Sequence, residues 1–313
     1  PNYTLVNGNG DVFIVDYCNN SIRKVAANTN QITTIAGNGF REYNGDSILA
    51  TKACLFWPAG IALDTIDNFL YISENLGHRI RKVNLNTGII TTIAGNGTNG
   101  YNGDSILAIN AQINSPDAIT LDNYGNIYFV DAGNYRIRKI IKNTGIIYTV
   151  AGNGISGFSG DGGNAIFAKI SASKGLSIDI YGNIYISDTY NHRIRKVFAN
   201  TNQIISIIGN GNSGFSGDGG LATLAKLNQP RGISVDEFQN IYFVDHNNNR
   251  IRKVSSTNNY ITTIAGSGNQ SYNGDNINAL SANLFLPLHV SIDKFGNLYI
   301  ADDLHNRVRK VSI

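Results

Sequence analysis

The sequence predicts an all-β protein, a six-bladed β-propeller in which the blades are four-stranded antiparallel sheets. The main indication is an Arg-Ile/Val-Arg-Lys run that occurs five times at a spacing of 57 residues. These runs begin at Arg79, Arg136, Arg193, Arg250 and Arg307. A sixth copy, Ser21-Ile22-Arg23-Lys24, is offset by one extra residue near positions 65–69. A fixed period of this length indicates a structural unit that must stack on its neighbours to bury its faces.

Each repeat contains short β-prone segments separated by turn residues. In one repeat they span residues 232–236, 240–245, 250–254 and 260–264, and they are rich in Ile, Val, Tyr and Thr. The intervening residues are Asp, Asn and Gly, which accept turn dihedrals. A horseshoe or superhelical solenoid would need a helix or a much shorter repeat, so a propeller blade fits this unit best.

A short helical turn is expected after each fourth strand. An aspartate that follows a glycine is followed by alanine four and seven residues later, which is helical spacing. These aspartates are Asp46, Asp104, Asp161, Asp218 and Asp275. We expect each of them to cap the turn, because a carboxylate can accept the unpaired N–H groups of a first helical turn. Calcium binding is the alternative, but each loop offers one carboxylate where such a site needs several oxygen ligands.

Several motifs resemble those of the NHL-repeat propellers. They include Gly-Phe-Ser-Gly-Asp-Gly-Gly at 157–163 and 214–220, Pro-Arg-Gly-Ile at 230–233, and Asn-His-Arg-Ile-Arg-Lys at 191–196. The resemblance covers essentially the whole chain and implies the propeller fold. It leaves the function open, because the family includes extracellular sensor domains, RNA-binding modules and, more distantly, lyases and lactonases.

Composition and charge narrow the class of protein. One domain, residues 1–313, accounts for the chain, and no apolar stretch approaches the roughly 20 residues of a membrane span. The net charge is +3, and much of the Lys and Arg is distributed once per repeat, so no nucleic-acid partner is predicted. Each first arginine has an acid five residues earlier, as in Asp131 and Arg136. Across a short hairpin this spacing predicts a structural ion pair.

The two ends of the chain fall at different points of the repeat. Residues 1–7 align with a first strand, and the chain stops just past a third strand. There are therefore six first strands but only five fourth strands, near Ile32, Ile89, Ile146, Ile204 and Ile261. We expect the last blade to lack its outer strand and the chain to be a segment of a longer protein whose flanking residues complete that blade. The alternative is a neighbouring molecule that supplies the strand and builds an assembly.

Cysteines and glycosylation sequons bear on the compartment. Cys18 and Cys54 fall in connections expected on the same face of blade one, which favours a disulfide over two free thiols. Sequons for N-glycosylation begin at Asn2, Asn19, Asn96 and Asn269. Together these signals predict a secreted or cell-surface glycoprotein.

Function is sought where the repeats differ. The residues just before or at the start of each first strand should ring one mouth of the central channel. The polar members of this set are Tyr3, Asp117, Lys174, Arg231 and His289. They predict a polar pocket for an anion or a peptide end. An idle solvated rim is the alternative.

A second variable set occupies the loops between the second and third strands. It comprises Tyr17, His78, Tyr135, Tyr190, His192, His246 and His305. Scattered His and Tyr suit a surface that binds protein or glycan. In contrast, an aromatic residue stands before every Gly-Asp loop, so we interpret it as packing; a ring of five equivalent glycan-binding pockets is the alternative.

Enzymatic chemistry has little support in the sequence. Propeller lyases and lactonases hold a divalent metal with several ligands from different blades, whereas the mouth here supplies Asp117 and His289. We predict no catalytic residue, metal site or cofactor. The sequence favours a noncatalytic interaction or structural module of a larger extracellular protein, whose partners are other domains of the same polypeptide or neighbouring subunits. The alternatives are a ligand-binding sensor and a metal-dependent lyase or hydrolase.

Overall fold

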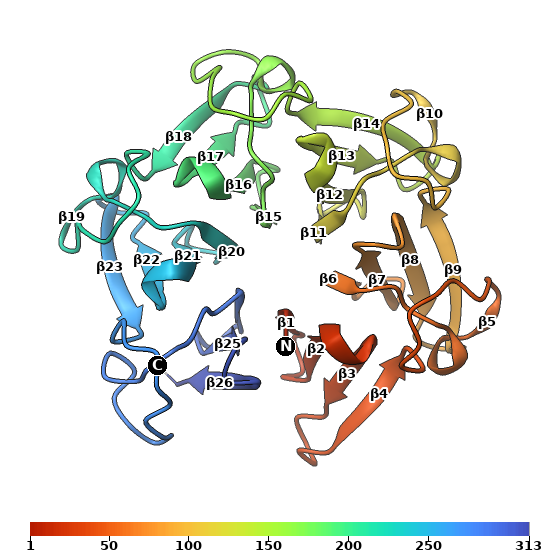
Figure 1. Cartoon of the computed structure of the whole chain (residues 1–313), viewed down its shortest axis with the longest axis horizontal. Coiled ribbons are helices and arrows are strands. Elements are labelled where there is room, and N and C mark those ends of the chain that lie inside the picture. Colours follow the sequence, from red (N-terminus) through yellow and green to blue (C-terminus); the bar gives the residue numbers. More distant parts are fainter. Residues whose placement is uncertain (313) are drawn as a thin grey trace. The chain divides into compact units, whose positions relative to one another are not determined.

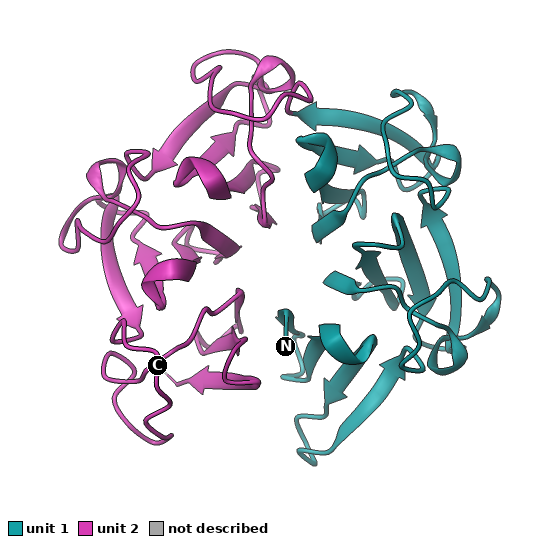
Figure 2. Ribbon diagram, viewed as in Figure 1, with its two compact units in different colours: residues 1–151 teal, residues 152–313 magenta. Residues whose placement is uncertain are grey.

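The computed structural model describes residues 1–312 and is a six-bladed β-propeller of small antiparallel sheets, as predicted (Figure 1). Ile313, the last residue of the chain, lies outside the described residues. The blades fall into two compact units, residues 1–151 and 152–313 (Figure 2). Each unit contains three of the sheets.

Unit 1 contains the first three blades. Blade one consists of β1 (Tyr3–Val6), β2 (Val12–Asp16), β3 (Ser21–Val25) and β4 (Ile32–Ala36). Blade two consists of β5 (Ile48–Leu49), β6 (Pro58–Asp64), β7 (Phe69–Glu74), β8 (Arg79–Asn84) and β9 (Ile89–Ala94). Blade three consists of β10 (Ile106–Leu107), β11 (Pro116–Leu121), β12 (Ile127–Asp131), β13 (Arg136–Ile140) and β14 (Ile146–Ala151).

Unit 2 contains the other three blades. Blade four consists of β15 (Gly175–Ile178), β16 (Ile184–Asp188), β17 (Arg193–Val197) and β18 (Ile204–Ile208). Blade five consists of β19 (Gly220–Leu221), β20 (Pro230–Val235), β21 (Ile241–Asp245), β22 (Arg250–Val254) and β23 (Tyr260–Ala265). Blade six consists of β24 (His289–Ile292), β25 (Leu298–Asp302) and β26 (Arg307–Val311), so within residues 1–312 this sheet has three strands, as predicted.

Three of the strands are two-residue segments that the sequence analysis did not predict. They are β5, β10 and β19, and each belongs to the linker that enters a blade. Each pairs with the fourth strand of that blade, β9, β14 or β23, on the edge that β8, β13 or β22 does not occupy. In these three blades the fourth strand is therefore held between the third strand of its own blade and the incoming linker.

The predicted helical turns exist, but the prediction that the aspartates cap them was wrong. A three-residue 3₁₀ turn, η2 (Ala50–Lys52), follows β5, and η3, η5 and η7 occupy equivalent positions at Ala108–Asn110, Ala165–Phe167 and Ala222–Leu224. The residue that precedes η2 is Leu49, and no side chain caps this turn. Asp46 instead accepts hydrogen bonds from Arg81 at 3.0 Å and Thr92 at 3.0 Å. Its carboxylate ties the linker to the third and fourth strands of the blade.

Apolar residues fill the space between adjacent blades. Between blades four and five, Ile194 and Ile208 pack with Ile233 and Phe243 in one buried cluster. Leu227, in the linker, completes this cluster. Strand residues that alternate inward therefore bury one blade against the next, as the repeat period required.

We predicted an ion pair between the acid and the first arginine of each run, but the acid pairs with the second arginine. Asp131 lies opposite Arg136 in the strand register, yet its carboxylate pairs with Arg138 Nη1 at 3.2 Å. Arg136 donates to the Asn134 carbonyl at 3.0 Å and stacks on Tyr101, 3.9 Å from the ring centroid. Arg138, the second arginine of the run, is fully buried, whereas Arg136 is half-buried. The predicted packing role of the aromatic residues before the Gly-Asp loops is confirmed by these stacks.

Candidate functional site

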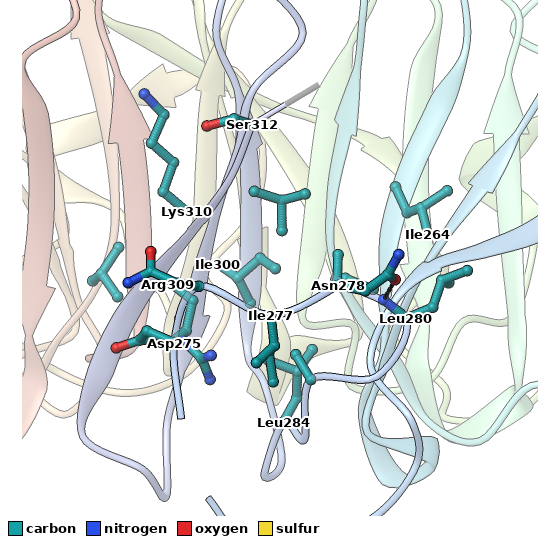
Figure 3. A pocket seen from close by; sticks show the side chains of 16 residues that line it. Ile264, Asp275, Ile277, Asn278, Leu280, Leu284, Ile300, Arg309, Lys310 and Ser312 are labelled. Atoms are coloured by element: carbon teal, nitrogen blue, oxygen red, sulfur yellow. Dashed lines mark hydrogen bonds and ion pairs between the residues drawn. The ribbon is translucent and has the colours of Figure 1, made fainter. Parts of the chain in front are cut away.

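The open side of blade six carries a groove of about 690 Å³. Its inner wall is β26, and its outer wall is the linker segment 276–280 (Figure 3). Leu284 and Ile300 also line it. We call this groove the strand slot, because in every other blade a fourth strand pairs with the strand equivalent to β26.

The inner wall is a strand edge without a neighbour on one side among the described residues. β26 pairs with β25 along residues 307–311 and with no other strand in residues 1–312. Its equivalent in blade five, β22, also pairs with β23, and there the Arg252 side chain is 0% exposed. The equivalent Arg309 side chain is 10% exposed, and Val308 and Val311 are half-buried. The edge of β26 therefore keeps apolar side chains and backbone groups accessible.

The outer wall is anchored to blade five. The Gly266 N–H donates to the Ala279 carbonyl at 2.9 Å, and the Ser267 N–H donates to the Ala282 carbonyl at 2.9 Å. Gly209 and Ala222 make the corresponding bond one blade earlier, also at 2.9 Å. Because these bonds come from the preceding blade, the wall stays in place without a fourth strand in blade six.

Two backbone N–H groups of the outer wall indicate what the slot can bind. In blade five, the N–H groups of Gly219 and Ala222 donate to β23 and the turn before it, to Ile261 O at 2.8 Å and Asn259 O at 2.9 Å. Blades two, three and four contain the same pair of bonds. In blade six the equivalent residues are Asn276 and Ala279, and within residues 1–312 neither N–H donates a backbone hydrogen bond.

The backbone of the outer wall already has the conformation that a bound strand requires. Asn276 has a φ of 59°, against 61° for Ser47 and 63° for Ser105 at the equivalent positions. A left-handed φ is costly for a residue other than glycine, although Asn tolerates it best. The wall therefore holds its shape before any strand binds.

Asp275 supplies a side-chain acceptor at one end of the slot. In blade five, Asp218 accepts from Arg252 at 2.7 Å and from the Thr263 hydroxyl at 2.6 Å. Asp275 accepts from Arg309 Nε at 2.8 Å and from the Tyr272 hydroxyl at 2.8 Å. The hydrogen bond from Tyr272, with a contribution from Arg309, lowers the pKa of Asp275, so the carboxylate is ionised at neutral pH. Its side chain is 58% exposed, against 38% for Asp218, because no fourth strand covers it.

In unit 1, two of the residues predicted at the channel mouth interact. Tyr3 is buried, and burial followed by the charge of Asp117 raises the pKa of its hydroxyl well above the usual value. Asn2 donates to the Ala59 carbonyl at 2.9 Å, which connects the first strands of blades one and two. A buried Tyr3 does not belong to a solvated rim.

In unit 2, the predicted mouth residues divide between buried and half-buried positions. His289 is buried and packs closely against Gly232. A Cβ atom added to Gly232 would lie 2.5 Å from the His289 Cα, so only glycine fits there. Lys174 and Arg231 are half-buried. The positive charge of Arg231 acts on the pKa values of His246 and Asp303. The binding pocket predicted from these residues remains a hypothesis.

Most of the predicted loop histidines connect the loop to the linker of a neighbouring blade. Nδ1 of His78 accepts the Ser115 N–H at 3.2 Å, and Nδ1 of His192 accepts the Gln229 N–H at 3.2 Å. Burial lowers the pKa of both imidazoles.

The other members of the loop set differ in exposure. His305 lies 2.8 Å from Asp302 Oδ2, Tyr17 packs against Trp57 at 5.2 Å between ring centroids, and Tyr135 is half-buried. Tyr190 is the exposed member. The recognition surface predicted from this set remains a hypothesis.

The predicted disulfide between Cys18 and Cys54 was wrong, because both residues are free thiols. Cys18 is exposed. Cys54 is buried, accepts from Asn38 Nδ2 at 3.3 Å and lies 3.6 Å from Glu42 Oε1, so its sulfur is held within the linker. The sequon residues Asn19, Asn96 and Asn269 are exposed, and Asn2 is half-buried.

Neither a cluster of metal-ligating side chains nor a membrane-spanning helix occurs in residues 1–312. No group of three or more His, Cys, Asp or Glu side chains in this part of the chain is arranged to hold a metal ion. The same residues include no helix with the length and apolar character needed to cross a membrane.

The chain is similar to several known proteins. A family model described as the Teneurin NHL domain matches residues 209–273. "Protein SUPPRESSOR OF QUENCHING 1, chloroplastic" of Arabidopsis thaliana is 25% identical over 253 residues, which cover 78% of this chain and 24% of that protein. Teneurin-1 of Homo sapiens is 27% identical over 223 residues, 64% of this chain and 8% of that protein.

Among solved structures, a structural genomics protein of unknown function from Bacteroides thetaiotaomicron VPI-5482 has the same fold. The TM-score is 0.72 at 20% identity, and the match covers 98% of this chain and 68% of that one. At a coarse level, a propeller of this type supports a role as a protein-interaction module. These matches support a propeller of the NHL-repeat type, which this chain resembles. The chain spans about a quarter of the Arabidopsis relative and less than a tenth of Teneurin-1.

Proposed function

We propose that this protein is a noncatalytic interaction module that binds an extended polypeptide segment in the strand slot. The segment becomes the fourth strand of blade six. The observation that carries this function is the pair of backbone N–H donors of Asn276 and Ala279, two residues that line the slot; their equivalents in four other blades donate to the fourth strand or to the turn before it. Strand addition to a sheet edge is a general mode of peptide recognition, in which main-chain hydrogen bonds provide affinity.

The slot lowers the cost of binding because both of its walls are preformed. An isolated edge strand offers one row of hydrogen-bonding groups, whereas a strand in the slot pairs with β26 and with the linker 276–280. The linker is already anchored by Gly266 and Ser267. Only the incoming segment loses backbone freedom, and preorganisation of one partner favours affinity.

The wider context of the module rests on the relatives. A match that covers a small share of each relative supports a segment of a longer polypeptide. The Teneurin match, to cell-surface proteins, supports the extracellular location, whereas the printed name of the Arabidopsis relative gives a chloroplast location. The test is removal of N-linked glycans from protein isolated from its natural source. A mass decrease that maps to Asn19, Asn96 or Asn269 supports export, and full-length protein recovered from an internal compartment without glycans contradicts it.

The binding test uses a labelled peptide that copies residues 259–267, which include β23. We expect saturable binding to the purified chain, measured by fluorescence anisotropy. In the variant Ala279→Pro, one donor of the outer wall is removed. The equivalent Ala222 opens a 3₁₀ turn after an extended residue, a position that accepts proline.

The matched control is Ala279→Ser, which retains the N–H group. We expect Ala279→Pro to weaken binding about fivefold to tenfold, the value of one hydrogen bond of about 1 kcal/mol. Ala279→Ser should bind as the original chain does. Absence of saturable binding, or equal binding by the two variants, contradicts the proposed function.

A further inference from the structure

A cavity of about 400 Å³ lies between blades four and five, inside unit 2. Blade four contributes aromatic and apolar side chains to its lining, among them Tyr181, Phe198 and Ile207, and blade five contributes Ile241 and Val254. Protein pockets that bind small molecules have volumes of about 300–1,000 Å³, so the cavity is large enough for a small ligand. None of its described lining residues belongs to blade six, which makes it independent of the strand slot.

A lysine that bridges two blades in unit 1 has no counterpart at this cavity. Lys142 of blade three pairs with Asp64 of blade two at 3.0 Å. Ser256 holds the equivalent position in blade five, because its N–H donates to Asn240 Oδ1 at 3.1 Å as the Lys142 N–H donates to Asn126 Oδ1 at 3.0 Å. The Ser256 hydroxyl donates to the same Asn240 oxygen at 3.4 Å, so at this position the space between the blades stays open.

Lys196 supplies the charge of the cavity. Among the described residues that line it, Lys196 is the one with a charged side chain, and its Nζ donates to the Tyr185 hydroxyl at 2.8 Å. The Asp179 carboxylate lies 3.7 Å from Nζ and already accepts from the Tyr181 N–H, the Asn183 N–H and amide, and the Tyr185 hydroxyl. Burial lowers the pKa of Lys196, and Asp179 opposes this shift only in part. A further anion beside the ammonium group would therefore be stabilised.

Gln239 adds a buried donor to the same cavity. Its side-chain Nε2 is shielded from solvent and has no hydrogen-bond partner within residues 1–312. Its backbone has a left-handed φ of 65°, at a turn position that blades three, four and six fill with glycine, Gly125, Gly182 and Gly296. A left-handed φ is costly for glutamine, and so is a buried donor without an acceptor. Two such costs at one residue point to a ligand that accepts from the amide.

The aromatic wall of the cavity is particular to blade four. Five residues after the first arginine of the run, blade four has Phe198, whereas blades two, three and five have Asn84, Ile141 and Ser255. Phe198 is half-buried, and the Lys196 ammonium lies 5.3 Å from the centroid of its ring. A ligand that covers the ring can therefore also reach the ammonium group.

We infer that this cavity binds a small carboxylic acid with a compact apolar body. The carboxylate accepts from Lys196 Nζ and Gln239 Nε2, and the body lies against Phe198 and the apolar side chains of blade five. A carboxylate provides an oxygen for each donor and a single negative charge for the single lysine. A phosphate would carry more charge into a largely apolar lining, at a greater cost of desolvation.

The binding test uses 3-phenylpropanoate as the probe and isothermal titration calorimetry as the measurement. We expect saturable binding of one molecule per chain. The neutral 3-phenylpropanamide should bind about tenfold more weakly, because the charge-assisted hydrogen bonds are lost. Propanoate should also bind at least about tenfold more weakly, because it lacks the ring that buries apolar surface. No saturable binding of 3-phenylpropanoate overturns the proposal, and equal binding of the acid and the amide overturns the choice of a carboxylate.

The variant Lys196→Met tests the charged contact, since it removes the ammonium and keeps an apolar stem. We expect the acid to lose about tenfold in affinity and the amide about twofold or less. The matched control is Lys253→Met, which changes the equivalent lysine of blade five, a residue outside the lining of the cavity. This control should bind the acid within about twofold of the original chain. Equal losses for acid and amide, or equal effects of the two variants, would overturn the contact between Lys196 and the carboxylate.

The variant Gln239→Gly separates binding from folding. Glycine fills this turn position in three other blades and adopts a left-handed φ without strain, so we expect an unchanged or higher Tm. The affinity for 3-phenylpropanoate should nevertheless fall about fivefold, the effect of one lost hydrogen bond. Unchanged affinity in this folded variant would overturn the role of the amide.

A carboxylate next to an apolar group also occurs at the end of a peptide chain. A short peptide that ends in phenylalanine presents the same two groups and is the comparison ligand. We expect it to bind no more tightly than 3-phenylpropanoate. Binding tighter by about tenfold would assign the site to a chain end and overturn the small acid as its ligand. These results do not depend on the strand slot, because none of the substitutions lies in blade six.

Discussion

The buried imidazole of His246 donates through Nδ1 to the Pro287 carbonyl at 2.9 Å. At the equivalent place in blade four, the Thr189 hydroxyl donates to the Pro230 carbonyl at 2.9 Å. The two blades thus make the same link to the next linker with different side chains. The difference has a consequence for pH, because only the imidazole titrates near neutrality.

We expect His246→Thr to remove part of the acid sensitivity of the protein. Burial, followed by the charge of Arg231, lowers the pKa of His246 to about 4 from an ordinary value of 6.5. The unfolded chain therefore takes up a proton between pH 6.5 and 4 that the folded chain does not, and stability falls as pH decreases through this window. The expected loss is roughly 2–3 kcal/mol.

The measurement for His246→Thr is urea unfolding at pH 7, 5 and 4. The variant should match the original protein at pH 7 and lose less stability at pH 4. Thr is the matched replacement because blade four already uses it in this position. Parallel losses in the two proteins would contradict this role of the imidazole.

Glu74 should have the opposite pH dependence. Burial raises its pKa to about 7, although the nearby Arg81 guanidinium opposes the shift. The folded protein therefore holds a proton that the unfolded chain releases above about pH 4.5, so the stabilisation is fully present below that pH and is lost as pH rises through 7.

We expect Glu74→Gln to flatten the decrease in stability between pH 5 and 8. The amide cannot ionise, yet its oxygen can still accept from Arg81. Guanidinium unfolding at intervals of one pH unit checks this result. A slope that is the same in Glu74→Gln and in the original protein would show that Glu74 is ionised throughout the range.

The buried arginines should matter more in closed blades than in the open one. Arg252 is fully buried between Asp218 and Asp245, so Arg252→Ala leaves an uncompensated buried carboxylate. Such a loss costs about 3–5 kcal/mol. Arg309→Ala, at the open edge, should cost about 1–2 kcal/mol, because water reaches Asp275 and because His305 remains 2.8 Å from the buried Asp302 carboxylate, the second partner of Arg309. Thermal unfolding of both variants measures the difference, and equal losses would argue that the slot is closed in solution.

The thiols should differ in reactivity. Cys18 is exposed, whereas burial raises the pKa of the Cys54 thiol and lowers its thiolate fraction. We expect one thiol to react rapidly with Ellman's reagent in the native protein and the second only after unfolding. Mass spectrometry of the labelled peptides identifies Cys18 as the fast site. If neither cysteine reacts with the reagent until the protein has been reduced, the two cysteines form a disulfide and the expected difference in reactivity is contradicted.

Predictions that depend on local pattern succeeded. The period of the Arg-x-Arg-Lys run and the strand segments around it depend on neighbouring residues alone, so they predicted the blades and the three-stranded last sheet. Predictions of which side chains meet were less accurate. The sequence places Asp131 opposite Arg136. It cannot show that Arg136 stacks on the ring of Tyr101, in the linker, or that the Asp131 carboxylate forms its ion pair with Arg138.

The candidate site divides in the same way. The sequence by itself determined that residues 1–313 include six first strands and five fourth strands, because both are counts over a repeat. Only the tertiary structure decided that the open edge is a preformed slot. That property depends on the bonds from Gly266 and Ser267 to the linker, and on the position of Asn276 and Ala279 in the lining of the groove. Backbone directions of this kind are set by contacts between blades, and no residue pattern within one blade encodes them.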